Sequence, residues 1–151
     1  MIHRFVALSL LAIAALAQGT YVVERKSSLS TSAETITVQL PAGTVRTAKL
    51  VDASIYCSAQ CEVTLERDGS LATTTTVTPV KLNSTDSTAT AQAYRSSNAG
   101  SGTTIGRQII GAGQVLVFDV EDVGLTAGET FTVRTDAITA TVIVSVKWRE
   151  F

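Results

Sequence analysis

The chain has a single histidine, His3, among its 151 residues. Ser-His-Asp hydrolysis, Cys-His catalysis and most zinc sites need an imidazole, so the sequence after the N-terminus excludes these arrangements. No Walker motif is present, and Gly100-Ser101-Gly102 lacks the strand-to-helix context of a dinucleotide-binding loop. We therefore predict that the protein is not an enzyme and needs no cofactor.

Charged and aromatic residues are also scarce. Only 17% of the residues are charged, the net charge is −1, and aromatic residues make up 5%. A chain so close to neutral has no electrostatic basis for binding nucleic acid or an anionic membrane. Proline occurs only twice, whereas threonine and valine are abundant, and this composition favours β-strands.

The first 17 residues have the pattern of a secretory signal helix. His3 and Arg4 form a short basic region, an apolar run extends from Phe5 to Ala17, and Ala15-Leu16-Ala17 matches a small-x-small cleavage site. The alternative is an uncleaved membrane anchor, but 13 residues fall short of the roughly 20 that span a bilayer. We predict a secreted protein, extracellular or at the cell surface, whose mature chain has no membrane span.

Residues 48–67 read AKLVDASIYCSAQCEVTLER. Apolar residues alternate with polar ones on both sides of Ser58-Ala59-Gln60, which predicts a hairpin with a three-residue turn. Cys57 and Cys61 then lie opposite each other, and a disulfide between them would fix the strand register. Two free thiols in a reducing compartment, or two metal ligands, are the alternatives. A slip in the apolar alternation between Leu50 and Val51 predicts a β-bulge.

The remainder of the chain alternates in the same way, without helical periodicity. Eight to nine strands separated by short turns predict an all-β fold, an antiparallel two-sheet β-sandwich of jelly-roll type. Pro79 cannot donate a ladder hydrogen bond, so the strand at 72–82 is expected at a sheet edge. Residues 33–151 are predicted to form this single domain.

Residues 18–32 are predicted to be an extended N-terminal arm. The segment begins with the apolar Tyr21, Val22 and Val23 and then becomes polar. It is either a weakly held, disordered arm or a strand that adds to the sheet edge of a neighbouring subunit, in which case Tyr21, Val22 and Val23 are the expected contact residues.

Few side chains are candidates for a binding site. Tyr56, Tyr94 and Arg95 could contact a sugar or a protein, or could simply cover a sheet edge or loop, whereas Trp148 shares its parity with three valines and is expected in the core. Asp119, Glu121 and Asp122 form a weak calcium candidate, although a solvated face or sheet-edge protection also explains them. Glu62 and Glu66 are explained in the same way.

These features favour a non-catalytic structural or adhesive subunit of an extracellular assembly, such as a filament, a cell surface or a virion surface. Such a protein would associate with itself as a homo-oligomer or with another extracellular protein. The alternative is a module that binds carbohydrate or another ligand, which requires Tyr56, Tyr94 or Trp148 to lie together on a concave face. An enzyme is a third possibility and would need two carboxylates that converge in a cleft.

Overall fold

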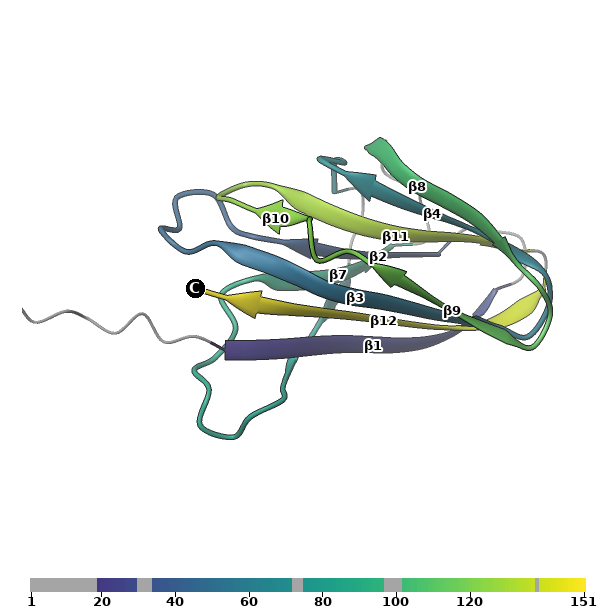
Figure 1. The fold of residues 1–151 in the computed structure, drawn as a ribbon, viewed down its shortest axis with the longest axis horizontal. Helices are drawn as coiled ribbons and strands as arrows, with labels where there is room; N and C mark the ends of the chain where they lie inside the picture. The colour runs from purple at the N-terminus through teal and green to yellow at the C-terminus, as the bar shows by residue number, and fades with distance from the viewer. Residues whose placement is uncertain (1–18, 30–33, 72–74, 97–101, 138) are drawn as a thin grey trace, which may run out of the picture.

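The protein is a sandwich of two antiparallel β-sheets in a computed structural model (Figure 1). The structure describes residues 19–29, 34–71, 75–96, 102–137 and 139–151, and the predicted signal helix at 1–17 lies outside these ranges. The described residues form twelve strands and no helix, so the all-β prediction is confirmed. Within them there is no apolar helix of membrane-spanning length.

The first sheet, sheet A, has β12 and β1 near its centre. Its path of paired strands runs β10-β3-β12-β1-β6, and β9 pairs with the same edge of β3 as β10. The strands of sheet A are β1 (Gly19–Leu29), β3 (Ala48–Cys57), β6 (Val80–Lys81), β9 (Gln114–Asp119), β10 (Gly124–Leu125) and β12 (Ala140–Glu150).

The second sheet, sheet B, has the order β5-β7-β2-β11-β4-β8. Its edge strands are therefore the short β5 and the longer β8. The strands of sheet B are β2 (Glu34–Gln39), β4 (Cys61–Arg67), β5 (Thr75–Val77), β7 (Gln92–Ser96), β8 (Thr103–Ile110) and β11 (Thr130–Ala137).

Eight of the strands pair in a nested way. β1 pairs with β12, β2 with β11, β3 with β9 and β4 with β8, all antiparallel. The first four of these strands alternate between the two sheets along the chain. The described residues between β4 and β8, at 68–71, 75–96 and 102, are called the insertion below; they add β7 beside β2, β5 beside β7 and β6 beside β1.

Strict alternation of apolar residues builds the core between the sheets. Along β12, every second side chain from Ala140 to Glu150 is buried. Trp148 is 0% exposed, as its parity predicted, and its ring lies 5.9 Å from that of Tyr21 on the neighbouring β1. Burial of two such aromatic side chains stabilises the fold by several kcal/mol in total, of order 2 kcal/mol each.

Two local predictions agree with the structure. The register between β3 and β12 shifts so that Lys147 lies opposite Asp52 and Trp148 opposite Leu50, which is the β-bulge expected at Leu50 and Val51. Pro79 lies between β5 and β6, which are edge strands of sheets B and A. In the described part of the expected strand at 72–82, residues 75–82, the chain forms two short strands in different sheets.

The N-terminal segment differs from its prediction as a weakly held arm. Gly19–Leu29 forms β1, which pairs with β12 along its whole length and with β6 on its other side. Tyr21 and Val23 enter the core, whereas Glu24, Lys26 and Ser28 are exposed. Arg25 and Ser27 follow at the inward positions, so the apolar alternation in the sequence ends after Val23. Pairing with β12 along the whole strand, and with β6 at Tyr21 and Val22, holds the strand in the sheet.

Candidate functional site

The two cysteines join the sheets rather than the two strands of a hairpin. Cys57 and Cys61 form a disulfide with their Cα atoms 6.4 Å apart. However, β3 pairs with β12 and β9, while β4 pairs with β11 and β8, so the predicted hairpin between β3 and β4 is wrong. Residues 58–60 cross from sheet A to sheet B, and the disulfide links the sheets at one end of the sandwich.

The three predicted contact residues of the N-terminal segment are parts of β1. Tyr21 is 0% exposed and Val23 is buried beside it in the core. Val22 points to the outer face of sheet A and is half-buried between Lys147 and Val80. The Tyr21 hydroxyl donates a hydrogen bond to the backbone oxygen of Ser87, 3.0 Å away. Tyr21 therefore fastens the insertion to the core.

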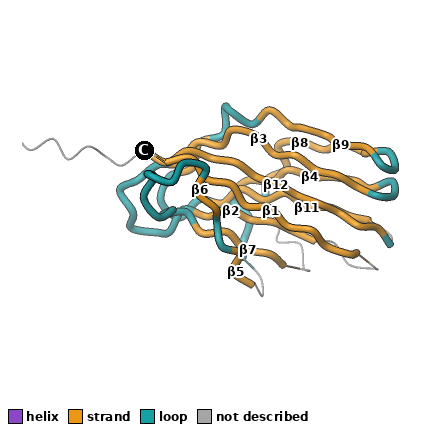
Figure 2. The backbone as a smooth tube through the Cα atoms, turned by 90° about the horizontal axis from the view of Figure 1, so that it is seen from below, coloured by secondary structure: helices purple, strands orange, loops and turns teal. Residues whose placement is uncertain are grey.

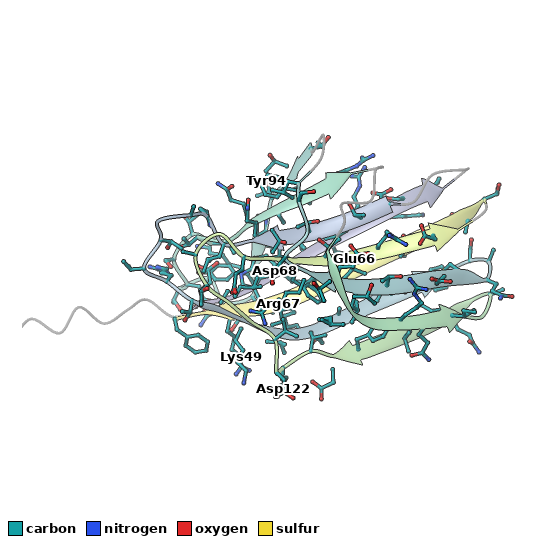
Figure 3. The ribbon with its side chains drawn as sticks, turned by 90° about the horizontal axis from the view of Figure 1, so that it is seen from above. Lys49, Glu66, Arg67, Asp68, Tyr94 and Asp122 are labelled. Atoms are coloured by element: carbon teal, nitrogen blue, oxygen red, sulfur yellow. A yellow bond between two sulfur atoms is a disulfide. The ribbon has the colours of Figure 1, made fainter. Side chains whose placement is uncertain are left out.

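The other candidate contact residues do not come together. Tyr56 lies on the outer face of sheet A, paired with Val115 and Ile143. Tyr94 lies on the outer face of sheet B and donates a hydrogen bond to the Gln92 side chain (Figure 3). The two tyrosines thus face opposite directions, and Trp148 is buried between the sheets.

Arg95, next to Tyr94, has a structural contact within its own sheet. Its Nε atom lies 3.6 Å from the Glu34 carboxylate, and Arg95 pairs with Ile36 in the ladder between β7 and β2. These contacts account for the position of Arg95 without a ligand.

The acidic candidates are also separated. Asp119 accepts a hydrogen bond from the Glu121 backbone amide at 3.1 Å, which closes a local turn. In the part of the chain that the structure describes, no group of three or more His, Cys, Asp or Glu side chains is placed to hold a metal ion, so Asp119, Glu121 and Asp122 do not form one.

Glu62 and Glu66 each have a cationic neighbour on the outer face of sheet B. Glu62 pairs with Arg107 at 3.1 Å, and the buried Glu66 pairs with Arg134 at 3.2 Å. Two carboxylates on a flat sheet face that are each paired with an arginine do not form the cleft of a glycosidase.

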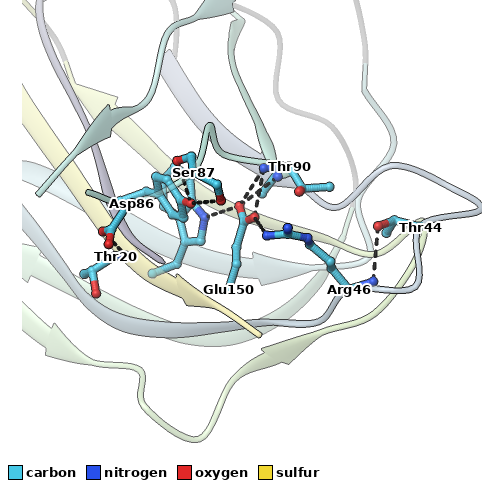
Figure 4. Close-up of polar contacts among 10 residues, drawn as sticks. Thr20, Thr44, Arg46, Asp86, Ser87, Thr90 and Glu150 are labelled. Atoms are coloured by element: carbon cyan, nitrogen blue, oxygen red, sulfur yellow. Dashed lines mark hydrogen bonds and ion pairs between the residues drawn. The ribbon is translucent and has the colours of Figure 1, made fainter. Parts of the chain in front are cut away.

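A buried carboxylate at the C-terminal end of β12 was missed by sequence reasoning. Glu150 is 0% exposed and accepts hydrogen bonds from the backbone amides of Thr90 and Ala91 and from the Trp148 indole (Figure 4). These bonds are 2.8, 2.9 and 3.1 Å long. Arg46 approaches the same carboxylate to 3.8 Å. The signal in the sequence is a glutamate at an inward position of a strand, two residues after the core tryptophan.

Glu150 and its neighbours hold the insertion against the sandwich. The Thr20 backbone amide of β1 donates to the Asp86 carboxylate at 2.9 Å, and Lys81, within the insertion, donates to the Asp86 backbone oxygen at the same distance. Both Glu150 oxygens accept hydrogen bonds from the protein, so this side chain holds residues 90 and 91 in place and has no free oxygen to act as a catalytic base.

The insertion covers part of one narrow side of the sandwich, where β6 pairs with Tyr21 and Val22 of β1. It places β5 at the edge of sheet B and β6 at the edge of sheet A, with Pro79 between them. β5 has three residues and β6 has two, and β6 carries Lys81. Short strands, proline and lysine are the features by which sheet edges avoid pairing with other chains.

The opposite narrow side is open. There β8 is the edge of sheet B and β9 lies along the edge of sheet A, joined by a tight turn at 111–113 (Figure 2). Among the described residues, β8 pairs only with β4 and β9 only with β3. Neither strand contains proline or lysine. Four of their large apolar side chains are exposed by 46% or more: Ile105, Ile109, Val115 and Val117.

We refer to β8 and β9 together as the open side. It has eight- and six-residue strands, unpaired backbone groups along both, and exposed apolar side chains beside them. An exposed strand edge of this length is a template for an added strand. It is therefore the candidate functional site that the geometry supports best.

Comparisons of the chain with family models, with curated proteins and with solved structures gave no match.

Proposed function

We propose that this protein is a non-catalytic structural subunit that self-associates into an extracellular assembly. The observation that carries the proposal is the asymmetry of the sandwich: one side ends in the short β5 and β6, with Pro79 and Lys81, whereas the open side ends in the longer β8 and β9, which have no proline or lysine. Soluble monomers protect strands of this length, because unpaired edges bind other chains. An unprotected pair of strand edges on an otherwise protected domain therefore indicates a surface that pairs with another chain in the functional assembly.

We further infer that the domain is a jelly roll with an insertion. In a jelly roll, a long antiparallel hairpin wraps into two four-stranded sheets. The first strand therefore pairs with the last, the second with the second-last, and each following strand with its counterpart. The four nested pairs described above follow this rule, and their orders within the sheets are β1-β12-β3-β9 and β2-β11-β4-β8. Jelly rolls are common in capsids and other assembled shells, which is compatible with the proposal but is an argument from the fold alone.

The N-terminal sequence pattern and the disulfide support the extracellular part of the proposal. The pattern of residues 1–17 is that of a secretory signal, and the disulfide between Cys57 and Cys61 is of the kind that persists in oxidising compartments. A covalent link between the sheets also stabilises the domain.

The proposal is tested by the concentration dependence of the oligomeric state. The full chain is expressed, purified and followed by sedimentation velocity from micromolar to near-millimolar concentrations. We expect the wild type to associate, because its open side offers two strand edges. A strict monomer throughout this range would contradict the proposal.

Two matched lysine variants identify the surface. Val117 on β9 and Val80 on β6 are exposed by 61% and 60%, on opposite sides of the sandwich. Val117→Lys places a charge beside the open edge and should weaken association by about tenfold, since a lysine on an edge strand disfavours pairing with another chain. Val80→Lys makes the same change on the covered side and should associate like the wild type. Equal behaviour of the two variants would refute the open side as the contact.

A further inference from the structure

We propose that two copies of this chain associate around a two-fold axis parallel to the strands, with β8 of each copy antiparallel to β9 of the other. This inference rests on the proposed function and specifies its contact. Sheet A of each copy would continue into sheet B of the second copy at both junctions. An interface of this kind is closed and uses the same surface of both molecules.

The disulfide fixes the positions of β8 and β9 relative to each other along the strand direction. Ile110 pairs with Cys61, and Gln114 pairs with Cys57. Since the two cysteines are bonded, Ile110 and Gln114 lie at about the same level at one end of the sandwich. The chain runs in opposite directions away from the turn, so Ile109 is level with Val115, and Arg107 is level with Val117.

A two-fold axis parallel to the strands preserves these levels and exchanges the two edges. Ile109 then lies opposite Val115 of the second copy, on the same outer face, and the reciprocal pair forms at the other junction. These side chains are exposed by 60% and 63% in the single chain. Apolar residues in directly opposed cross-strand positions stabilise a sheet, so this register covers both side chains at once.

The charges of the open side favour the same arrangement. Arg107 is the only charged residue of β8, and Asp119 is the only charged residue of β9. Both point to the outer faces, and in the proposed dimer they lie one diagonal step apart across the new ladder. A long side chain can reach a diagonal neighbour.

Asp119 lacks a cation in the single chain. Its ladder neighbour on β3 is Asp52, whose carboxylate is already paired with Lys147 at 2.7 Å. No described cation lies within ion-pair distance of Asp119 itself. Arg107 of the second copy would supply one, because its side chain is 58% exposed and only its Nε atom is engaged, with Glu62.

The main alternative is a two-fold axis perpendicular to the sheets. It pairs β8 with β8 and β9 with β9, and the register one residue from full overlap, which keeps outward side chains opposite one another, sets Arg107 opposite Arg107 of the second copy. Like charges in opposed positions destabilise a ladder. The two arrangements therefore make different predictions for charge reversal, and this difference is the basis of the test.

The test is a charge-reversal series followed by sedimentation at low salt. Arg107→Glu and Asp119→Lys each place like charges together at both junctions of the proposed dimer and should each weaken association by about tenfold. The double variant restores opposite charges and should return the dissociation constant to within about threefold of the wild type. An equimolar mixture of the two single variants should also associate like the wild type.

Two controls isolate the intermolecular charge. Glu62→Gln removes the in-chain partner of Arg107 and should leave association unchanged. Asp119→Asn keeps an oxygen for the Glu121 amide and should show only the loss of the attraction, a smaller effect than Asp119→Lys.

Each outcome bears on one of the two claims. Single variants that associate like the wild type would overturn the pairing of β8 with β9, while the proposed self-association would stand. A double variant no better than the single variants would also overturn the pairing. A wild type that stays monomeric would instead overturn the proposed function itself.

Discussion

Replacing Glu150 by glutamine tests whether a saturated buried carboxylate holds the insertion on the sandwich. The side chain keeps its size, but one of its two oxygens becomes an amide group that donates hydrogen bonds. In the wild type, Oε1 accepts from the Ala91 amide and the Trp148 indole, and Oε2 accepts from the Thr90 amide at 2.8 Å. After the change, an N–H group faces the Thr90 amide or the Trp148 indole, whichever way the side chain turns.

The expected loss follows from these contacts. Hydrogen bonds to a charged acceptor contribute about 1.5–3 kcal/mol each, roughly twice the value for a neutral acceptor, and an unsatisfied buried donor costs about 1–3 kcal/mol. Relief from burying the charge offsets part of the loss. We expect Glu150→Gln to lower the free energy of unfolding by about 2–4 kcal/mol, a large share of the 5–15 kcal/mol typical of a domain.

The assay is denaturant unfolding followed by tryptophan fluorescence, since Trp148 is the only tryptophan and donates to Glu150. Hydrogen exchange should show faster exchange at the amides of Thr90 and Ala91. Asp122→Asn changes an exposed carboxylate in the same way and should be neutral. A Glu150→Gln variant within about 0.5 kcal/mol of Asp122→Asn would refute the reasoning.

Two further predictions concern the ends of the sandwich. Replacing both Cys57 and Cys61 by alanine should lower the free energy of unfolding by about 2 kcal/mol, because the closed loop is short; an unchanged denaturation midpoint would contradict this. A hydrogen bond from the Thr126 backbone amide at 2.6 Å, assisted by Arg67 at 3.1 Å, lowers the pKa of Glu129 below its ordinary value of 4.5, although partial burial opposes the shift. Because the folded-state pKa is the lower one, the carboxylate stabilises the fold fully above pH 4.5, and this stabilisation is lost as the pH falls through the lowered pKa. Melting temperatures of the wild type and of Glu129→Gln should therefore converge on acidification, and a constant difference between them would count against this role.

Local features of the fold could be predicted because they depend on neighbours in the sequence. Alternation along 140–148 identified the strand and the inward face that carries Trp148. The parity slip at Leu50 and Val51 located the bulge, and Pro79 identified an edge. Each of these signals follows from the two-residue repeat of a strand or from the missing amide of proline.

The candidate site could not be predicted in the same way. Tyr56, Tyr94 and the acidic residues were singled out by residue type, yet the sheets place the tyrosines on opposite outer faces and do not gather the acids. The sequences of β8 and β9 alone do not show that these strands lie at sheet edges. Whether a strand is central or at an edge depends on which other strands pair with it, and that information is spread over the whole chain.

The sequence by itself determined that this protein forms strands, which faces of many of them turn inward, and that Cys57 lies close enough to Cys61 for a disulfide. Only the tertiary structure decided that this disulfide joins two sheets, that residues 19–29 belong to the domain and that Glu150 is buried. The physical reason is that a strand buries one face wherever it pairs, so local alternation is the same in a hairpin and in a crossing between sheets. The choice between them is made by contacts between residues that are far apart in the chain.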